Sequence, residues 1–178
     1  FLWKLVECAA RLVLGDPSAE STDVGPLIRL AEAERVEAWI KDAVESGAKL
    51  VVGGERKGSV ITPAILTATK PGMKIRDEEV FGPIVTIEPY EDFEQALADV
   101  NHSKYGLQAG LLTRDAGRIL TAYRELEVGA LIVGDTPAWR LDPMPYGGIK
   151  DSGLGREGLR SAIEEMTEPR MLVMAGIS

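Results

Sequence analysis

The feature that most constrains the fold is a regular alternation of strand-like and helical patterns between residues 83 and 135. The strand-like segments are "PIVTIEPY", "LQAGLLT" and "GALIVGD". Two segments between them, 91–106 and 114–127, carry apolar residues at helical spacing: Phe93, Ala96, Leu97 and Val100, then Ile119, Leu120, Tyr123 and Leu126. Strands joined by helices make right-handed crossovers. We therefore expect an α/β fold with an open, mostly parallel sheet and helices on both faces.

Further elements flank this region. Helices are expected over residues 2–12, 28–46 and 154–165, and a strand over 48–56. The segment "SVITPAILTAT" contains a proline, which favours an edge strand. The final apolar run, "PRMLVMAG", predicts a terminal strand that either closes this sheet or pairs with another chain. We expect residues 1–167 to form one α/β domain and residues 168–178 to provide the terminal strand.

Charge and composition exclude several classes of partner. The formal net charge of −8 disfavours nucleic-acid binding, which needs a cationic surface. No apolar run approaches the roughly 20 residues that span a bilayer, so we expect no membrane partner. One cysteine cannot form an internal disulfide, which indicates a reducing, cytoplasmic compartment. The chain has one histidine, so we also expect no metal site.

Three glycines, Gly153, Gly155 and Gly158, have the G-x-G-x-x-G spacing of a dinucleotide-binding fingerprint. That fingerprint must follow a strand and precede an acidic residue by about 20 positions. Here a turn-rich loop precedes the glycines, and Ser178 is already the last residue of the sequence. We interpret the spacing as coincidence.

Two single residues are candidates for chemistry and are set aside. Cys8 lies on or beside the apolar stripe of the first predicted helix, next to Glu7. A reactive thiol needs an electropositive, accessible setting, so Cys8 is interpreted as a small hydrophobic residue and not as a nucleophile. His102 follows a predicted helix and is interpreted as a surface residue near its C-terminus.

The segment "RDEEVFGPIVTI" is a stronger candidate for a ligand-binding site. Side chains two residues apart in an extended segment point the same way, so Glu79 and Phe81 are able to clasp a ligand that carries hydroxyls and a flat ring. A solvated acidic turn before a core phenylalanine explains the pattern equally well. The residues alone leave both interpretations open.

Several ordered motifs together resemble the aldehyde dehydrogenase superfamily. They are "LVLGDPSAESTDVGPLI", "EEVFGPIVTI", "YGLQAGLLT" and "PYGGIKDSGLGRE". The resemblance covers essentially the whole chain and implies that residues 1–167 are part of the family's catalytic domain. It also implies an oxidoreductase that uses NAD or NADP to oxidise an aldehyde to an acid.

The resemblance also implies roles for individual residues. Glu79 matches the glutamate that accepts hydrogen bonds from the nicotinamide ribose, and Phe81 matches the aromatic residue near the nicotinamide. Arg35 falls near another position that reaches the ribose, but Glu32 departs from the family pattern, and this contact stays open. The final strand, 168–178, is expected to make the protein a homo-oligomer.

The sequence departs from the family pattern in one decisive respect. The nucleophilic cysteine of a "GQxC" segment and the general-base glutamate belong upstream of Phe1, and Cys8 does not replace the nucleophile. A helical pattern that begins at Phe1 without an initiating methionine indicates a piece of a longer polypeptide. We expect this chain by itself to be inactive.

A second departure concerns the loop "IVGDTPAWRLDPMPYGG". It resembles a subgroup that acts on lactaldehyde and other small polar aldehydes. Trp139 and Arg140 are therefore expected to line the substrate site, with Arg140 binding an anionic group on the substrate. A surface ion pair between Arg140 and Asp142 is the alternative.

Two other functions remain open at this stage. One is a non-catalytic interaction module that docks through its terminal strand. The other is an independent nucleotide-binding domain built on the glycine spacing. If the glycines are structural instead, Lys150 and Arg156 are expected to anchor their turn by hydrogen bonds.

Overall fold

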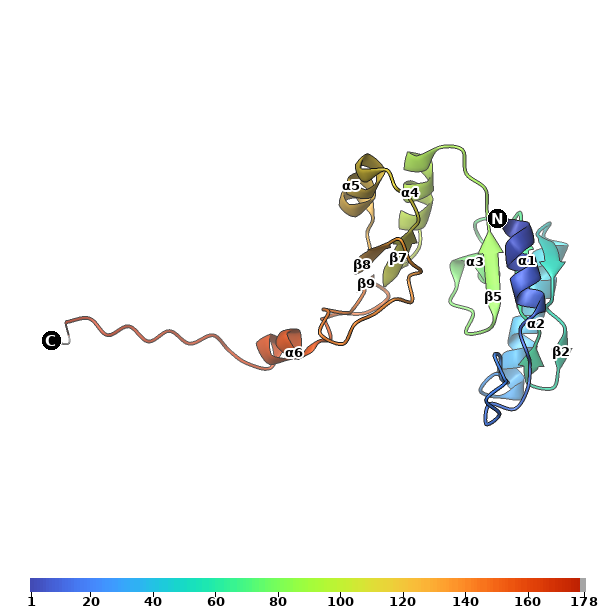
Figure 1. Cartoon of the computed structure of the whole chain (residues 1–178), viewed down its shortest axis with the longest axis horizontal. Coiled ribbons are helices and arrows are strands. Elements are labelled where there is room, and N and C mark those ends of the chain that lie inside the picture. Colours follow the sequence, from blue (N-terminus) through green and yellow to red (C-terminus); the bar gives the residue numbers. More distant parts are fainter. Residues whose placement is uncertain (177–178) are drawn as a thin grey trace. The chain divides into compact units, whose positions relative to one another are not determined.

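The computed structural model describes residues 1–176, and their contacts divide the chain into two compact units (Figure 1). The first unit comprises Phe1–Pro89, and the second begins at Tyr90. Among the described residues, none of the helices combines the length and apolar character that a bilayer span requires.

The first unit is built on a small mixed sheet with the strand order β1–β4–β5. Strand β4 (Ala64–Thr67) is antiparallel to β1 (Lys49–Val52) and parallel to β5 (Ile84–Ile87). The other elements are α1 (Leu2–Ala10), α2 (Leu30–Glu45), α3 (Lys74–Asp77) and the hairpin of β2 (Arg56–Lys57) and β3 (Val60–Ile61). Helix α2 ends where Gly47 adopts φ +102°, as expected for a residue just beyond a helix C-terminus.

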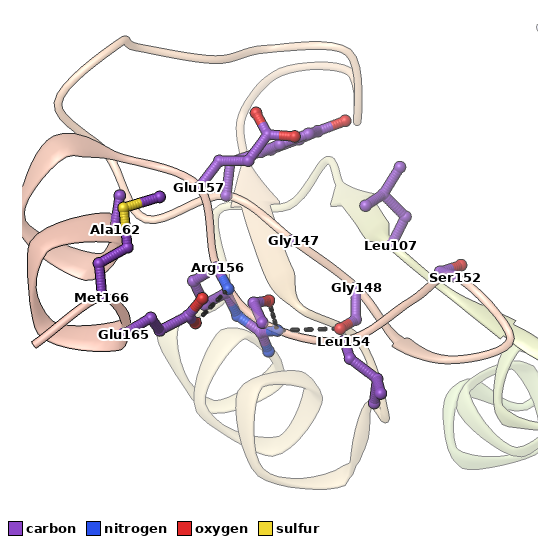
Figure 2. A pocket seen from close by; sticks show the side chains of 12 residues that line it. Leu107, Gly147, Gly148, Ser152, Leu154, Arg156, Glu157, Ala162, Glu165 and Met166 are labelled. Atoms are coloured by element: carbon purple, nitrogen blue, oxygen red, sulfur yellow. Dashed lines mark hydrogen bonds between the residues drawn. The ribbon is translucent and has the colours of Figure 1, made fainter.

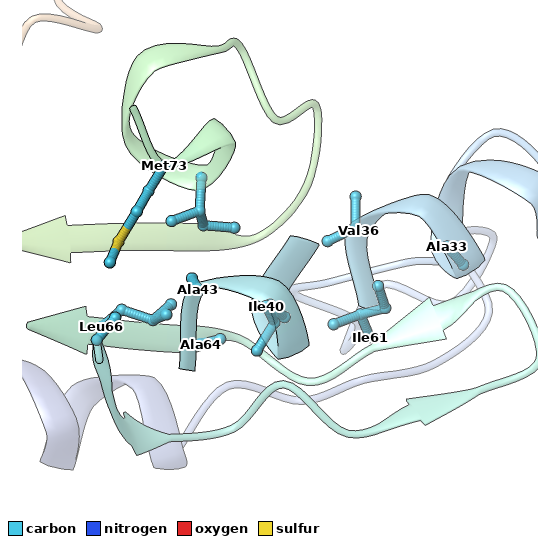
Figure 3. Packing of buried hydrophobic residues seen from close by; sticks show 10 residues of the cluster. Ala33, Val36, Ile40, Ala43, Ile61, Ala64, Leu66 and Met73 are labelled. Atoms are coloured by element: carbon cyan, nitrogen blue, oxygen red, sulfur yellow. The ribbon is translucent and has the colours of Figure 1, made fainter. Parts of the chain in front are cut away.

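Helix α2 carries one side of the core of this unit. Its buried residues recur at helical spacing, and they pack against the hairpin, the sheet and α3 (Figure 3). Val36, Ile61 and Leu66 are completely buried. Val80 and Ile84, in and after the loop between α3 and β5, also pack against this cluster. Helix α2 therefore supports the loop that carries the candidate site.

The prediction that the Pro63 segment is an edge strand is wrong. Strand β4 is the central strand of its sheet. Pro63 lies just before the strand, where its missing N–H removes no ladder hydrogen bond, and the first strand residue, Ala64, donates to the Pro83 carbonyl.

The second unit contains two small sheets. Strands β7 (Gln108–Leu111) and β8 (Ala130–Val133) are parallel, and β6 (Tyr105–Gly106) and β9 (Ile149–Lys150) are antiparallel. Helix α5 (Ala116–Glu125) connects the parallel pair, α4 (Phe93–Asn101) precedes β6, and α6 (Leu159–Glu165) follows β9. The Asp92 and Asp115 carboxylates cap α4 and α5 by accepting hydrogen bonds from backbone N–H groups.

The α/β class is confirmed, but the strands do not form a single sheet. Within residues 1–176 they lie in four small sheets with both parallel and antiparallel pairs. The β2–β3 hairpin leads the chain back beside β1, and such a short connection produces an antiparallel pair. The two parallel pairs, β4–β5 and β7–β8, are each joined by a crossover that contains a helix, α3 and α5 respectively.

The predicted apolar faces of α4 and α5 are only partly buried. Leu97 and Ala122 are buried, whereas Val100, Leu120 and Tyr123 are exposed. The predicted helix 154–165 begins only at Leu159, because Gly155 and Gly158 adopt φ +74° and +111°.

The predicted terminal strand is not formed within the described part of the chain. Residues 168–176 pair with no described strand, and 177 and 178 lie outside the described residues. Four successive side chains in this segment are exposed: Met171, Leu172, Val173 and Met174. The prediction that this segment pairs between subunits stays a prediction.

Candidate cofactor and substrate sites

The loop between α3 and β5 presents Glu79 and Phe81 at the surface of the first unit. Glu79 is exposed, and Phe81 is 75% exposed with a backbone φ of +51°. A bulky L-residue rarely adopts such a left-handed conformation, because Cβ approaches the following carbonyl. Strain of this kind persists where the surroundings impose it and is concentrated at functional sites. Phe81 is therefore a surface residue and not the core phenylalanine of the alternative interpretation.

Helix α2 contacts the backbone of this loop on both sides of Phe81. Arg35 Nη2 donates to the Val80 carbonyl oxygen at 2.7 Å. On the other side, Gly82 faces α2: a Cβ built on it would be in ordinary van der Waals contact, at 3.4 Å, with both methyl carbons of Val36. Sequence reasoning missed this arrangement, in which Arg35 contacts Val80 and the next residue of the helix, Val36, faces Gly82.

The Arg35 guanidinium contacts three groups of the protein itself. Besides Val80, its Nε donates to Glu32 Oε2 at 2.8 Å, and its Cζ lies 4.4 Å from the centroid of the Trp39 ring. Arg29 also pairs with Glu32, at 2.8 Å. Hydrogen bonds from Arg29 and then Arg35 lower the pKa of Glu32 below its ordinary value. The spacing of Glu32, Arg35 and Trp39 along one helix face is the sequence signal for this cluster.

The second unit contains Trp139 and Arg140, each about 40% exposed. Arg140 Nη2 pairs with Glu157 Oε2 at 2.8 Å, and its guanidinium stacks 4.1 Å from the centroid of the Tyr146 ring. The alternative partner considered from the sequence, Asp142, is replaced by Glu157. A β-bridge between Tyr146 and Glu157 brings both contacts together, and this bridge has no simple sequence signal.

The loop that carries Trp139 and Arg140 is also tied to strand β7. Gln108 Nε2 donates to the carbonyl oxygens of Pro137 and Trp139, the latter at 3.3 Å. The other amide atom of this side chain, Gln108 Oε1, is buried without a partner among the described residues. The strand therefore fixes the backbone at the start of the loop.

The glycine-rich segment lines a pocket of about 480 Å³ beside α6 (Figure 2). Arg156 Nη1 donates to the carbonyl oxygens of Gly148 and Gly155 at 2.9 and 2.7 Å, and the Arg156 backbone N–H donates to Glu165 Oε1 at 3.0 Å. The Glu165 carboxylate thus already accepts a hydrogen bond from the Arg156 backbone N–H, a group that would have to face the phosphate in a phosphate-binding loop. This arrangement supports a structural role for the glycines.

Lys150 anchors the same region to the end of α4. Its Nζ donates to the carbonyl oxygens of Asn101 and Ser103 and pairs with Glu127 at 2.8 Å. The expectation that Lys150 and Arg156 anchor this turn by hydrogen bonds agrees with these contacts. The Lys150 contacts join segments distant in sequence.

The structure gives neither Cys8 nor His102 a catalytic setting. Cys8 is exposed, and it lines an apolar groove together with Leu5, Ile65 and Val85, in agreement with its place beside the apolar stripe of α1. His102 occupies the C-terminal end of α4, as predicted. Within residues 1–176, no group of three or more His, Cys, Asp or Glu side chains is placed to hold a metal ion.

Comparison with known proteins identifies the family. The model of the aldehyde dehydrogenase family matches residues 1–172. The chain belongs to this family. Glu79 and Phe81 lie in its first unit, and Trp139 and Arg140 lie in its second.

Two curated relatives are similar to nearly the whole chain. A 3-sulfolactaldehyde dehydrogenase from Priestia aryabhattai is 53% identical over 98% of this chain and 36% of its own length. A lactaldehyde dehydrogenase from Methanococcus vannielii is 45% identical over 98% of this chain and 37% of its own length. The chain thus spans little more than a third of these relatives.

Solved structures show the same fold. Aldehyde dehydrogenase 21 from Physcomitrella patens, in complex with its product succinate, has a TM-score of 0.96 at 40% identity, over 99% of this chain and 37% of its own. A glyceraldehyde-3-phosphate dehydrogenase from Methanocaldococcus jannaschii, complexed with NADP, has a TM-score of 0.88 at 37% identity, over 93% and 36%.

Proposed function

We propose that this chain is the part of an NAD- or NADP-dependent aldehyde dehydrogenase that contacts the nicotinamide end of the cofactor and lines the substrate site. The observation that carries the proposal is the exposed Glu79–Phe81 loop in a chain of this family. The cofactor would accept a hydride from the substrate. This chain's own residues bind and orient the reactants.

Glu79 and Phe81 have the chemistry that the nicotinamide riboside requires. An exposed carboxylate accepts hydrogen bonds from a diol, and an exposed aromatic ring confines a flat heterocycle by contact with its face. The Phe81 ring extends from a backbone whose preceding carbonyl, that of Val80, accepts a hydrogen bond from Arg35 of α2. A pre-positioned ring reduces the ordering cost of binding.

Arg140, with Trp139 beside it, is proposed to bind an anionic group of the substrate. The guanidinium already has an orientation fixed by Tyr146 and Glu157, and its remaining donors suit a carboxylate, sulfonate or phosphate. The substrates named for the Priestia and Methanocaldococcus enzymes carry a sulfonate and a phosphate, and succinate carries two carboxylates. Lactaldehyde, named for the Methanococcus vannielii relative, is small and uncharged. We infer a small polar aldehyde as the substrate class, with an anionic group as the feature that Arg140 would bind.

The nucleophilic cysteine and the general base are proposed to lie in polypeptide that precedes Phe1 in the complete enzyme. Cys8 lies in an apolar groove of the first unit, without the electropositive setting that activates a thiol. This chain alone is then inactive. Its single cysteine agrees with a reducing, cytoplasmic location.

An interaction module is the second candidate function. It is favoured by the exposed apolar segment at Met171–Met174, which has the composition of a strand that pairs with another subunit. The same segment serves a homo-oligomeric enzyme equally well, so activity discriminates between the two functions.

The test is an assay of the complete enzyme beside this chain, with NAD or NADP and small aldehydes with and without an anionic group. We expect reduced cofactor to accumulate with the complete enzyme and anionic aldehydes, and none with the chain alone. Absence of aldehyde oxidation by the complete enzyme, together with association of the chain with a partner subunit, would support the interaction module.

A further inference from the structure

We propose that Arg35 is a positioning residue that holds the Glu79–Phe81 loop in its cofactor-binding conformation and does not itself contact the cofactor. The inference rests on the proposed function of that loop. From the sequence it stayed open whether Arg35 reaches the ribose of the nicotinamide; in this proposal it acts on the loop instead.

The first argument is the number of contacts that the Arg35 side chain makes within the protein. Its Nε and Nη2 donate to Glu32 and Val80, each within 2.8 Å, while the guanidinium plane lies over Trp39. Glu32 lies one turn before Arg35 and Trp39 one turn after it, so the helix itself supplies two contacts. The third contact reaches 45 residues along the chain to the loop.

The second argument is the strain at Phe81. A residue with φ +51° keeps that conformation only if its neighbours are held. Gly82 accepts a hydrogen bond from Ile84 N at its carbonyl oxygen, and it faces Val36 of α2. On the Val80 side, the hydrogen bond from Arg35 holds the carbonyl group, while the Val80 side chain packs against the buried cluster. The polar contact that orients the backbone before Phe81 therefore comes from Arg35.

The third argument is that arginine suits this position better than lysine. A planar guanidinium donates to two acceptors in fixed directions while its face stacks on an aromatic ring. A lysine ammonium reaches the Val80 carbonyl only as a flexible point charge. Its stacking on Trp39 would be weaker, so the loop would be held less firmly.

The experiment uses the complete enzyme with Arg35→Gln, Arg35→Lys and the control Arg29→Gln. Arg29 pairs with the same Glu32, but its side chain is 71% exposed and its hydrogen bonds within the described residues go to Glu32. Hydrogen–deuterium exchange is measured over residues 80–84, with β4 as an internal reference, and NAD and NADP dissociation constants are measured by fluorescence. Rates at saturating cofactor complete the set.

For Arg35→Gln we expect about tenfold faster exchange in the loop and about tenfold weaker cofactor binding. A tenfold change is what the loss of one charge-assisted hydrogen bond produces at the low end of its range. Exchange in β4 and kcat at saturating cofactor should stay close to those of the unmodified enzyme. Arg35→Lys should recover part of both losses, and Arg29→Gln should change neither.

Three results would overturn the inference. Weaker cofactor binding with unchanged loop exchange means that Arg35 contacts the cofactor directly. Equal acceleration of exchange in β4 means that Arg35 supports the whole unit and not the loop. Faster loop exchange without weaker binding means that loop conformation does not control affinity. If the unmodified enzyme binds neither NAD nor NADP, the proposed function and the cofactor role of Arg35 fail together, while unchanged affinity in the variants of a binding enzyme rejects the Arg35 role alone.

Discussion

Arg156 donates a hydrogen bond of 2.9 Å to the carbonyl oxygen of Gly148, eight residues earlier in the chain. The same nitrogen donates to Gly155, and the Arg156 backbone is held by Glu165 of α6. One side chain therefore joins the glycine turn before β9 to the turn that leads into α6. This contact explains the glycine-rich segment without a nucleotide.

Replacing Arg156 with alanine is expected to destabilise this chain by about 2 kcal/mol, because two carbonyl groups lose a charged hydrogen-bond donor. Arg160→Ala is the matched control. Arg160 is 91% exposed and pairs only along its own helix with Glu164, so its loss should cost less than about 0.5 kcal/mol. Urea unfolding of both variants measures the difference, and equal losses would contradict the structural role of Arg156.

Much of the architecture was predictable because its signals are local. The apolar spacing along 28–46 predicted α2 to within a few residues, and the Asp92 and Asp115 caps lie at the starts of two helices predicted from spacing alone. The same spacing could not predict how much of each helix is covered. Burial of Leu120 or Tyr123 depends on the area of the sheet opposite, which is a tertiary property.

The candidate sites show the same limit. Family resemblance was needed to select Glu79 and Phe81, since the pattern alone also fitted a solvated turn. Neither pattern nor resemblance indicated the strained φ of Phe81 or its support by Arg35, because a contact across 45 residues leaves no local trace. Likewise, Glu157 became the partner of Arg140 through strand pairing and not through sequence proximity.

The left-handed conformation of Phe81 predicts that substitutions there affect stability and cofactor binding differently. Phe81→Gly should be about 1 kcal/mol more stable than Phe81→Ala, since glycine adopts φ +51° without a Cβ clash and alanine does not. Both variants should bind cofactor more weakly in the complete enzyme, because both lose the ring. Thermal unfolding and cofactor titration measure the two effects, and a less stable glycine variant would contradict the inferred strain.

The ion pair between Glu37 and Arg56, at 2.8 Å, predicts a pH dependence of stability. The hydrogen bond from Arg56, and then that from Lys41, lower the pKa of Glu37 in the folded chain. A lowered pKa stabilises the fold above the pKa of the unfolded glutamate, and the contribution disappears as the pH falls through the folded value. Glu37→Gln should therefore reduce the free energy of unfolding more at pH 7 than at pH 3.

Urea unfolding of the unmodified chain and of Glu37→Gln at both pH values checks this prediction. Glu45→Gln, an exposed glutamate at the end of α2, serves as the control. A Glu37→Gln loss that is the same at pH 3 and pH 7 would show that the pair contributes through packing and not through charge.

Arg140→Ala is expected to raise KM for anionic aldehydes by about tenfold in the complete enzyme, the effect of removing one charged hydrogen-bond partner. KM for neutral aldehydes of the same length should change little. Steady-state rates with matched pairs of aldehydes measure the ratio. If both KM values rise equally, Arg140 shapes the loop through Tyr146 and Glu157 and does not recognise an anion.

The most direct test of the central claim is the affinity of the complete enzyme for NAD and NADP after Glu79→Gln, with Glu45→Gln as the control. Glutamine retains the size and one acceptor oxygen of Glu79 but loses the charge that strengthens hydrogen bonds from a diol. Titration should give a dissociation constant for the preferred cofactor about ten- to a hundredfold higher than that of the unmodified enzyme. An unchanged dissociation constant would contradict the assignment of the Glu79–Phe81 loop to the cofactor.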